Sequence, residues 1–505
     1  MWSSTFITEL SKPVLTPVWL VSTARFGTGL SEPYGGDYSI SNYPGYADEA
    51  IIGEGGVVVR GPRLAVASWT SSIGQFSIPI AGSIKGVLRH FTRGSSVVVR
   101  MGFPGWAVSD FEIIAVGRLQ NVTGRSESWV MTCNDMLSML ESRFESSAAS
   151  LPLFYDVGTS TTLTSAYTLG DATVNVTSTT GFSKQTGNNG AIKIGDFYLT
   201  YTGTTGTTFT GCSAAGQFGT TAATTASGAV TESVLLSGHP IDITRRLLVS
   251  TGLGTNGSYD QYPISWGLGF SQLYVDETDM QTWASQVVTV SSGAYQWDVV
   301  EDGQVDGPGG WWQAYLARAG LFLTIRQGLI TCRAGQAHVG TSAQPYMPDI
   351  EITDADLIAI SIQHFDASAS VEYAAVTAQT ATGSTTASDA IQTLPAEAVR
   401  LYDLAAVVFG NESAQRNDVT GRLTEMSCRI PMAIFAKCRG VRLAELTPGD
   451  VVPLTTTRVY GRTADTIDGF EARRCYVAQA SMDWQRFEVS LILLAYPTDT
   501  EVFAP

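Results

Sequence analysis

The sequence predicts an α+β protein that is mainly β. Three observations lead to this prediction. The 505 residues include 51 Gly, and only 15% of them are charged, a composition that favours strands and turns over helical bundles. β-Branched runs bounded by Gly or Pro recur towards both ends of the chain. Helical periodicity is concentrated in the middle. Because 505 residues are too many for one core, we expect three or four domains, and the pass along the chain below places four.

The first predicted domain covers residues 1–150 and is a β-domain that ends in a helix. Its expected strands are 57–68, 96–104, 111–123 and 128–133. After Cys133 the apolar residues recur on one helical face, from Met136 to Phe144, and Asn134 or Asp135 can serve as the N-cap.

An inserted Thr- and Gly-rich β-module is predicted at residues 151–236. Residues 156–235 contain 22 Thr but only six charged residues. Ile192, Ile194, Phe197, Leu199 and Tyr201 alternate with polar residues, with an interruption at Gly195-Asp196. Such alternation around a tight turn predicts short strands joined in a hairpin.

A mixed α/β domain is predicted at residues 237–349. A helix is expected at 237–252, with Pro240 in its first turn and Gly252 as its stop signal. Further helical patterns occur at 276–288 and 311–319. The segment after them predicts a hairpin that turns at Gln327-Gly328.

The last predicted domain, residues 350–505, returns to strands. The expected strands are 352–365, 371–380, 427–438, 445–455, 475–484 and 487–497; a polar helix is expected at 412–425 and a turn at 465–470. Each end of the chain is therefore rich in strands and contains one helix. This pattern suggests two related β-barrels in one polypeptide.

The charge of the chain argues against nucleic-acid binding. There are 46 acidic and 30 basic residues, a formal net charge of −16, whereas nucleic-acid binders are basic. An acidic wall can still repel DNA usefully. Only five cations are Lys, and the remaining Arg residues suit ordered interface pairs. The first residues do not resemble a signal peptide, and no apolar run is long enough for a membrane span.

No catalytic motif stands out. Residues 252–257 match G-x-G-x-x-G but follow a predicted helix, so a tight loop explains them better than a dinucleotide site. The acids and glycines at 298–310 lack the spacing of a calcium loop and indicate a solvated turn. Scattered acids such as Glu141 and Asp276 would permit glycosidase chemistry, but their spacing selects no pair. We therefore expect a protein that is not an enzyme.

The six cysteines lie far apart and form no C-x-x-C motif. Buried, reduced thiols are the simplest interpretation. The alternative is a metal or iron–sulfur site, for which the candidate ligands are Cys332, Cys428, Cys438 and Cys475. Apart from this weak candidate we expect no cofactor.

Two turns supply candidate contact points for other proteins. Gly102-Phe103-Pro104-Gly105 follows a strand and is expected to expose an aromatic side chain, and Pro448-Gly449-Asp450 precedes another strand. Taken alone, each turn is explained more simply by a purely structural role. The interface candidates are Phe103, Pro104, Trp106, Trp266, Pro448 and Asp450.

Together these stretches resemble the hub protein at the tail tip or baseplate of tailed bacteriophages. The resemblance rests on residues 97–106, 238–270 and 443–455, of which the second stretch is the most specific. Residues 191–230 resemble modules that are common in phage tail and fibre proteins. The insertion at 156–235 departs from simpler hubs, so binding outside a ring is plausible there.

The resemblance implies a homotrimer in which each chain supplies two tube-forming β-barrel domains. Six barrels would form a ring that joins a sixfold tail tube to a threefold tip. The implied partners are the distal tail protein ring, the tail tube and a tail-tip or fibre protein. Genome DNA would pass through the lumen without specific binding, between acidic walls. The implied location is the tail tip of a virion made in the cytoplasm of a bacterial host.

Two other functions are compatible with the sequence. One is a tail-associated enzyme that degrades the cell wall, with the inserted module as its substrate-binding part. The other is a receptor-binding adhesin whose inserted module contacts host glycans. Some phage tip proteins carry a fused lysozyme or peptidase or an iron–sulfur cluster, but no such enzyme domain is visible here.

Overall fold

The computed structural model divides the chain into two compact units. Unit 1 consists of Met1–Ser142, Leu321–Ser370 and Glu425–Pro505, and unit 2 of Arg143–Gly320 and Val371–Thr424. The residues that the structure describes are 2–12, 15–24, 38–47, 49–50, 52–53, 56–65, 70–81, 87, 90–91, 93–125, 128–138, 140, 160–168, 170–182, 190–194, 197–214, 228–249, 274–286, 297–301, 308–335, 350–364, 373–380, 383–390, 399–409, 419, 432–459, 462–463, 466–467 and 469–495.

The N-terminal segment of unit 1 is a helix followed by strands. Ser3 caps the helix, because its hydroxyl accepts a hydrogen bond from the Phe6 N–H. The described elements are α1 (Ser4–Leu10), β1 (Val18–Ala24), β2 (Tyr38–Ser41), β3 (Glu49–Ala50), β4 (Val58–Arg60), β5 (Leu64–Ala65), β6 (Thr70–Ser71), β7 (Gln75–Ala81), β8 (Ser96–Gly102), the 3-10 helix η1 (Val108–Asp110), β9 (Glu112–Arg125) and β10 (Ser128–Asp135).

The rest of unit 1 is also built of strands. The predicted hairpin turn at Gln327-Gly328 is confirmed, with positive φ at both residues. The elements are β20 (Leu321–Arg326), β21 (Leu329–Ala334), β22 (Ile352–Thr353), β23 (Leu357–His364), β27 (Met432–Arg439), the 3-10 helix η4 (Val441–Glu445), β28 (Val451–Thr456), β29 (Arg462–Thr463), β30 (Thr466–Ile467), β31 (Phe470–Asp483) and β32 (Glu488–Ala495).

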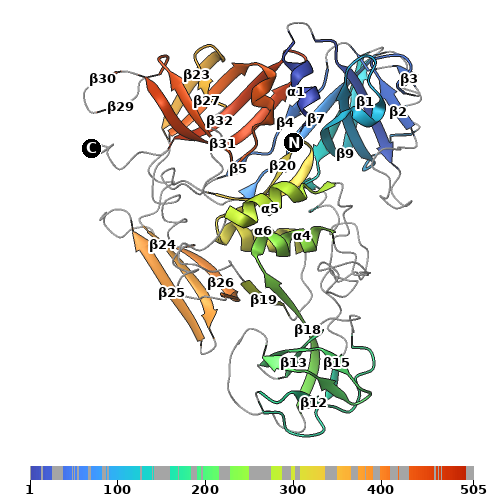
Figure 1. Ribbon diagram of the computed structural model, residues 1–505, viewed down its shortest axis with the longest axis vertical. Helices are drawn as coiled ribbons and strands as arrows, with labels where there is room; N and C mark the ends of the chain where they lie inside the picture. Colours follow the sequence, from blue (N-terminus) through green and yellow to red (C-terminus); the bar gives the residue numbers. More distant parts are fainter. Residues whose placement is uncertain are drawn as a thin grey trace. The chain divides into compact units, whose positions relative to one another are not determined.

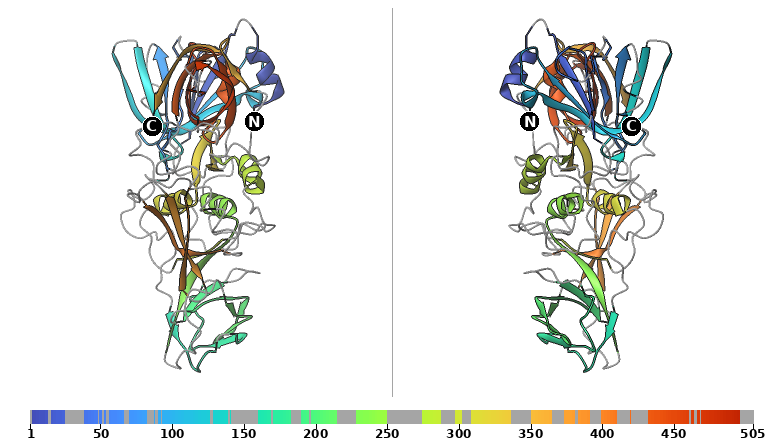
Figure 2. Two further views of the ribbon diagram at one scale, coloured as in Figure 1. Left: turned by 90° about the vertical axis from the view of Figure 1, so that its left-hand side faces the viewer. Right: turned by 90° about the vertical axis from the view of Figure 1, so that its right-hand side faces the viewer.

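One 14-stranded sheet joins the two ends of the chain. Its main path runs β23-β27-β32-β31-β4-β7-β10-β9-β8-β1-β2-β3, and β28 and β22 extend it beside β31. The junction is the antiparallel pair β4–β31, in which Val59 lies opposite Met482. Both views of Figure 2 show the blue N-terminal strands together with the orange-red C-terminal strands.

The two halves of this sheet repeat one strand order. Apart from β2 and β3, which continue the sheet beyond β1 and have no equivalent among the described strands of the other half, the N-terminal half runs β4-β7-β10-β9-β8-β1. The C-terminal half runs β23-β27-β32-β31-β28-β22. Numbered along the chain within each half, both orders are second, third, sixth, fifth, fourth, first. The last pair differs, because β1–β8 is antiparallel and β22–β28 is parallel. The sheet topology is therefore compatible with the prediction that the two ends of the chain are related.

The repeat extends to the register of one hairpin in each half. β9 and β31 each have 14 residues, and each is followed by an eight-residue partner strand. From the turn, five residue pairs form in both hairpins, beginning at Arg125↔Ser128 and Asp483↔Glu488. A bulge then skips one residue of the long strand, Gln120 in β9 and Ala478 in β31.

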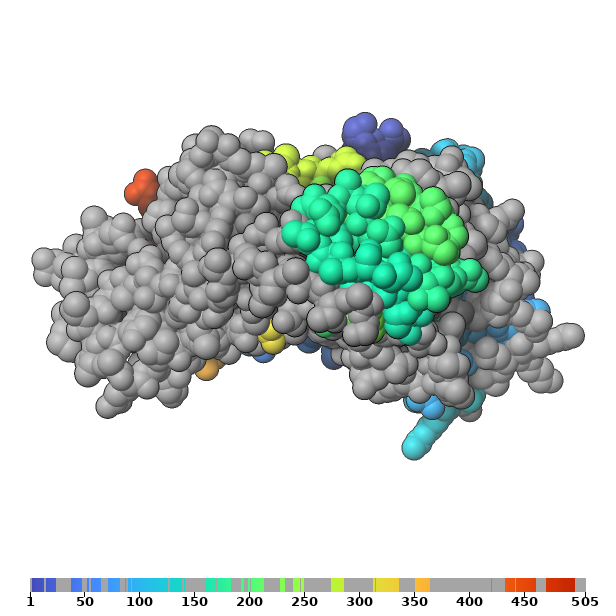
Figure 3. All heavy atoms as spheres, turned by 90° about the horizontal axis from the view of Figure 1, so that it is seen from below, coloured from blue at the N-terminus to red at the C-terminus, as the bar shows by residue number. Residues whose placement is uncertain are grey.

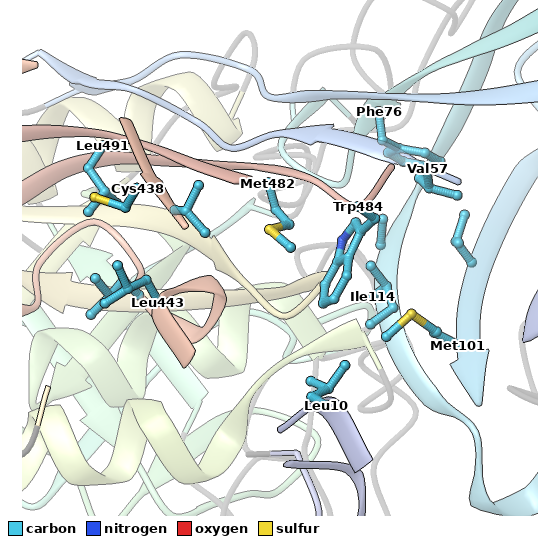
Figure 4. Packing of buried hydrophobic residues seen from close by; sticks show 14 of the residues in the cluster. Leu10, Val57, Phe76, Met101, Ile114, Cys438, Leu443, Met482, Trp484 and Leu491 are labelled. Atoms are coloured by element: carbon cyan, nitrogen blue, oxygen red, sulfur yellow. The ribbon is translucent and has the colours of Figure 1, made fainter. Parts of the chain in front are cut away.

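One hydrophobic core lies under both halves. Trp484 and Met482 come from the C-terminal half, and Val57, Phe76 and Ile114 come from the N-terminal half; all are buried in one cluster (Figure 4). The junction also requires a glycine. A Cβ at Gly61 would lie 2.2 Å from the Ala480 carbonyl oxygen, so only glycine lets the two strands approach here. This close approach breaks the predicted strand 57–68 into β4 and β5.

Unit 2 combines a second sheet with three described helices. Its nine-stranded sheet runs β17-β14-β13-β18-β19-β26-β24-β25, with β11 beside β18. The elements are β11 (Ser160–Thr162), β12 (Thr173–Asn175), β13 (Gly190–Ile194), β14 (Phe197–Tyr201), β15 (Gly203–Thr204), β16 (Thr208–Thr210), β17 (Ser213–Ala214), β18 (Ala229–Gly238), α4 (Pro240–Val249), α5 (Glu277–Gln286), β19 (Trp297–Glu301), α6 (Pro308–Arg318), β24 (Tyr373–Thr380), β25 (Gly383–Ala390) and β26 (Val399–Phe409).

The Thr-rich module has a core of its own. Twelve buried residues between Leu163 and Val230 form one cluster, which includes Ile192, Leu199 and Phe209. The predicted hairpin is confirmed, since β13 and β14 pair from Gly190↔Tyr201 to Ile194↔Phe197. Figure 3 shows the described residues of the module as a continuous green surface.

The mainly β prediction is confirmed, although none of the described sheets closes into a barrel. Figure 1 shows β24, β25 and β26, which the sequence alone placed with the C-terminal strands. In the structure β26 pairs with β19, and residues 371–424 belong to unit 2. The predicted helix at 412–425 and the stop at Gly252 lie outside the described residues, apart from the helical Val419. Among the described helices, none is long and apolar enough to cross a membrane.

Candidate interface site

The predicted turn after β8 is a type II β-turn. The Trp106 N–H donates to the Phe103 carbonyl oxygen at 3.0 Å, which closes the turn over Pro104 and Gly105. Gly105 has φ +91°, as the third position of this turn requires. The Gly105 N–H donates to the Tyr46 hydroxyl at 2.8 Å, and this hydrogen bond fixes the tip of the turn.

The turn buries one aromatic residue and leaves another half-buried. Phe103 is only 5% exposed, so the expectation that it projects into solvent is wrong. Its ring packs at 5.8 Å from Phe6 of α1 and at 5.2 Å from Trp106. Burial of the ring against α1 is favourable because it removes a large apolar surface from water. Trp106 is half-buried, and Pro104 is exposed.

An open groove of about 650 Å³ lies beside this turn. Trp2 and Thr5 border it from the α1 region, Trp106 and Asp110 from the β8–β9 loop, and Leu329 from the β20–β21 hairpin. Both walls are tied together, because the Ser3 N–H donates to the Glu112 carboxylate at 2.7 Å. The groove is therefore an assembled feature of three segments.

The groove is acidic at its rim. Asp110 and Glu112 contribute carboxylates to it, and within the described residues neither forms an ion pair. Carboxylates beside a half-buried Trp can receive a cationic side chain through charge and cation–π attraction. The groove thus has the chemistry that a contact with a cationic segment requires, and its lining residues hold no nucleophile–base arrangement.

Two exposed apolar side chains, Val108 and Tyr43, lie in this loop or beside it. Of the described residues, Ile7, Tyr43, Val108 and Val130 are the large hydrophobic side chains that remain exposed. Val108 lies in the loop, Ile7 follows Phe6 in α1, and the Tyr43 ring contacts Tyr46 at 5.8 Å. Exposed apolar residues in one place are typical of contact surfaces. Sequence reasoning missed Tyr43 and Tyr46 because no local pattern links them to residue 105.

The second predicted turn is internal to unit 1. Pro448 is buried, and Asp450 is 3% exposed. The Asp450 carboxylate accepts from the Arg333 guanidinium at 2.8 Å and from the Thr447 N–H at 2.7 Å. Arg333 also donates to the Pro448 carbonyl oxygen at 3.2 Å. The contacts described for this turn tie β28 to the hairpin strand β21, and contact with another protein stays a prediction. Trp266 lies outside the described residues.

The three candidate cysteines that the structure describes are not brought together. Cys332, Cys438 and Cys475 are buried on three different strands, and Cys428 is outside the described residues. No group of three metal-binding side chains occurs in the described part of the chain. Burial raises the pKa of Cys438 and of Cys475 to about 12, so both remain protonated thiols at neutral pH.

A polar network stabilises the loop between β22 and β23. Asp356 accepts from the Thr353 N–H and hydroxyl, each at 2.9 Å, and from the Arg442 guanidinium at 2.7 Å. Burial alone would raise the pKa of Asp356, but these donors lower it below its usual range. Asp354 is held similarly by the hydroxyls of Thr456 and Thr457, which lower its pKa.

Charge is divided unequally between the units. Unit 1 holds 21 of the 30 cations and 26 of the 46 acids, a net charge of −5. Unit 2 holds the remaining 9 cations and 20 acids, a net charge of −11. Most Arg residues therefore belong to the unit that contains the 14-stranded sheet.

Comparison with known proteins gives matches at the level of structure only. The sequence matches no protein-family model and no curated protein. The chain is similar to a tail protein from Neisseria meningitidis, at 10% identity and a TM-score of 0.40, over 94% of this chain and 96% of that one. It is also similar to the 43 kDa tail protein of prophage MuSo2 from Shewanella oneidensis, at 9% identity and a TM-score of 0.39, over 95% and 98% of the two chains.

A third match is a component of the E. coli type VI secretion system, described as structurally similar to T4 bacteriophage tail proteins. It is 8% identical, with a TM-score of 0.31, over 90% of this chain and 76% of that one. Phage tail proteins, to which the sequence bears a resemblance, are thus also among the solved structures that this chain is similar to.

Proposed function

We propose that this chain is a structural protein of a phage tail and that it acts as a trimeric hub at the distal end. In this role two tube-forming domains per chain, built on the two halves of the unit 1 sheet, provide six similar elements around a ring. The ring adapts a sixfold tail tube to a threefold tip. The proposed neighbours are a distal tail ring, the tube, and a tip or fibre protein.

The repeated strand order in unit 1 carries this proposal. Two segments more than 200 residues apart have the same six-strand order and the same bulge position in their long hairpins. A polypeptide with two such halves can place six near-equivalent elements around a threefold axis.

The charge distribution is compatible with a DNA conduit. A lumen lined by unit 1 would be weakly acidic overall, since this unit carries a net charge of −5. An acidic wall does not displace counterions from the DNA phosphates, so it gains no binding free energy from their release and does not retain DNA. Exposed Arg residues of unit 1 would then serve contacts between proteins, where their planar fork forms ordered pairs.

The candidate interface site would contact a neighbouring tail protein. The Trp106 face and the carboxylates of Asp110 and Glu112 suit a segment with Arg or Lys between apolar residues. Pro104 is exposed beside it and can join the contact. Phe103 supports the turn from below.

The test is the symmetry of the assembly. We expect the purified chain to have the mass of a trimer by light scattering, and the tail to show a threefold ring directly below a sixfold ring by electron microscopy. The variant Glu471→Gln, which changes one exposed carboxylate of β31, serves as a control that should leave the mass unchanged. A solitary monomer at the concentration reached in assembled tails would contradict the hub proposal.

A second candidate function is adhesion through the Thr-rich module. Its separate core within residues 163–230 supports this candidate, because such a module can be carried as an appendage. Deletion of residues 156–235 distinguishes the two roles. Intact tails that no longer adsorb to cells would favour adhesion, and failed tail assembly would favour a scaffold role. Release of fragments from peptidoglycan by the purified protein would instead favour a cell-wall-degrading enzyme.

A further inference from the structure

Strands β4 and β31 pair at the junction of the two halves of unit 1. Within the described residues, the equivalent strands of the opposite halves, β23 and β9, form no such pair. In the chain, the edge strand β4 of the N-terminal half pairs with the turn end of β31, from Val58↔Asp483 to Arg60↔Ser481. By the repeated strand order, β23 corresponds to β4, and β9 corresponds to β31. No described strand pairs with the free edge of β23 or with the same edge of β9 at Thr123–Arg125.

We propose that β23 of one copy pairs antiparallel with the turn end of β9 in the next copy. The proposal rests on the trimeric hub proposed above and names the surfaces that close its ring. The contact repeats between chains the junction that β4 and β31 form within one chain. Three internal and three intermolecular junctions then alternate around the ring.

The register of the repeat predicts which residues meet. Counting from the hairpin turns and their shared bulge makes Arg125, Gly124 and Thr123 equivalent to Asp483, Met482 and Ser481. Phe76 of β7 and Ile434 of β27 occupy equivalent places, opposite Cys133 and Leu493 respectively. Val59 lies opposite Phe76, and Ile362 lies opposite Ile434, so Ile362 is equivalent to Val59.

This register places three pairs across the proposed junction. In the chain Val59 lies opposite Met482, so Ile362 of one copy should lie opposite Gly124 of the next. The neighbouring pairs are then Ser361 with Arg125, and Gln363 with Thr123.

The side chains at these positions agree with the pairing. Ile362 is half-buried and packs on the main core, as Val59 does. Gly124 has no side chain, and a Cβ there would lie 2.3 Å from the Ser128 carbonyl oxygen, 2.6 Å from Trp129 Cα and 3.0 Å from Cδ2 of the Trp129 ring. Ile362 of a neighbouring copy can therefore extend over Gly124 onto Trp129. The outward residues Ser361, Gln363, Thr123 and Arg125 are all exposed.

The edge strand itself is open to pairing. β23 has eight residues and contains no Lys, Arg, Asp, Glu or Pro, the residues by which edge strands usually avoid association. Its backbone groups on the outer edge need hydrogen-bond partners, which a second strand would supply.

Paired cysteines test the contact. Directly opposed residues of an antiparallel pair have Cβ atoms about 4.5–5.5 Å apart, within reach of a disulfide after small adjustments. The double variant Ser361→Cys/Arg125→Cys should therefore form covalent dimers and trimers on oxidation, seen by non-reducing electrophoresis. We expect at least about tenfold more covalent trimer than in either single variant.

Two controls sharpen the test. The single variants report any cross-linking through the native cysteines, five of which are buried. Ala359→Cys/Arg125→Cys keeps the same exposed face but shifts the register by two residues, so it should cross-link much less.

The outcomes separate this inference from the hub proposal. A native trimer whose matched pair links no better than the single variants overturns the β23–β9 contact and leaves the hub intact. An oxidised monomer with an internal link also overturns the contact. A wild-type chain that stays monomeric when concentrated overturns both. Thermal unfolding of each variant before oxidation verifies that it is folded.

Discussion

The two halves of the unit 1 sheet share a strand order but differ in how the first strand is attached. β1 pairs with β8 over seven residues in antiparallel register, whereas β22 pairs with β28 over two residues in parallel. The N-terminal half adds α1 and the aromatic loop at residues 103–111. The C-terminal half instead uses the carboxylates of Asp354 and Asp356 to hold its short first strand. The comparison teaches that strand order can be kept while the stabilising chemistry changes from apolar to polar.

The largest expected effect concerns the core that joins the halves. Trp484 is 2% exposed and contacts Trp2 and Trp19 with ring centroids 5.9 and 6.0 Å away. Trp484→Ala should lower the free energy of unfolding by about 5 kcal/mol, because the surrounding side chains fill the resulting cavity only in part. Urea unfolding followed by circular dichroism measures this loss. If the two halves unfold as separate domains, the urea curve should instead show two transitions, of which Trp484→Ala shifts only one.

The next effect tests the polar contact between the C-terminal half and the β20–β21 hairpin. Arg333→Met leaves the Asp450 carboxylate buried without its cation, at side-chain exposures of 2% and 4% in the native pair. We expect a loss of about 3 kcal/mol in the free energy of unfolding. The double variant Arg333→Met/Asp450→Asn should recover part of it, since the uncompensated charge is removed. Equal losses in the single and double variants would contradict a charge-based explanation.

The Thr-rich module supplies a reference outside the two halves. Leu199 is fully buried in the module core, so Leu199→Ala should destabilise the module by about 2–3 kcal/mol. Hydrogen exchange should increase in residues 160–230 and stay unchanged in β9 and β31. Faster exchange in those strands as well would show that the module and the sheet unfold together.

The smallest effect concerns the pH dependence of the C-terminal half. The folded pKa of Asp356 is lowered, so its stabilising contribution is present above the unfolded pKa, near 4, and is lost as pH falls through the folded value. Asp356→Asn should cost about 1 kcal/mol at pH 7 and flatten the acid side of the stability curve. Thermal unfolding between pH 2 and pH 7 measures both. Glu471→Gln is the exposed control, and an unchanged pH profile in Asp356→Asn would reject the assigned role.

Local sequence patterns were sufficient for many individual elements. The alternation at 192–201 and the Gln327-Gly328 turn predicted hairpins that the structure contains, because strand period and turn conformation depend on neighbouring residues. Pro240 in the first turn of α4 is another local signal. The type of the turn after β8 also follows from Pro104 and Gly105 alone.

The candidate site could be predicted only in part. The sequence indicated the turn at 103–106, but the ring that it leaves accessible is Trp106, because α1 covers Phe103. The groove is formed by segments near residues 2, 106 and 329, and their spacing along the chain does not predict that they lie together. Pro448 and Asp450 were predicted as contact candidates, but both are buried beside Arg333, which is 115 or more residues away in the sequence.

By itself, the sequence determined many strands and turns and most described helices, since backbone propensity and side-chain periodicity act over a few residues. No local pattern predicted β1, β7, β25 or β26, and the solvated turn expected at 298–310 is wrong, because β19 and the start of α6 lie there. Only the tertiary structure decided that both ends of the chain share one sheet and that residues 371–424 join β19 instead. Those choices depend on pairing between distant strands. Many strands of similar composition could pair, and the selection is made by a common core and by close approaches such as Gly61 against Ala480.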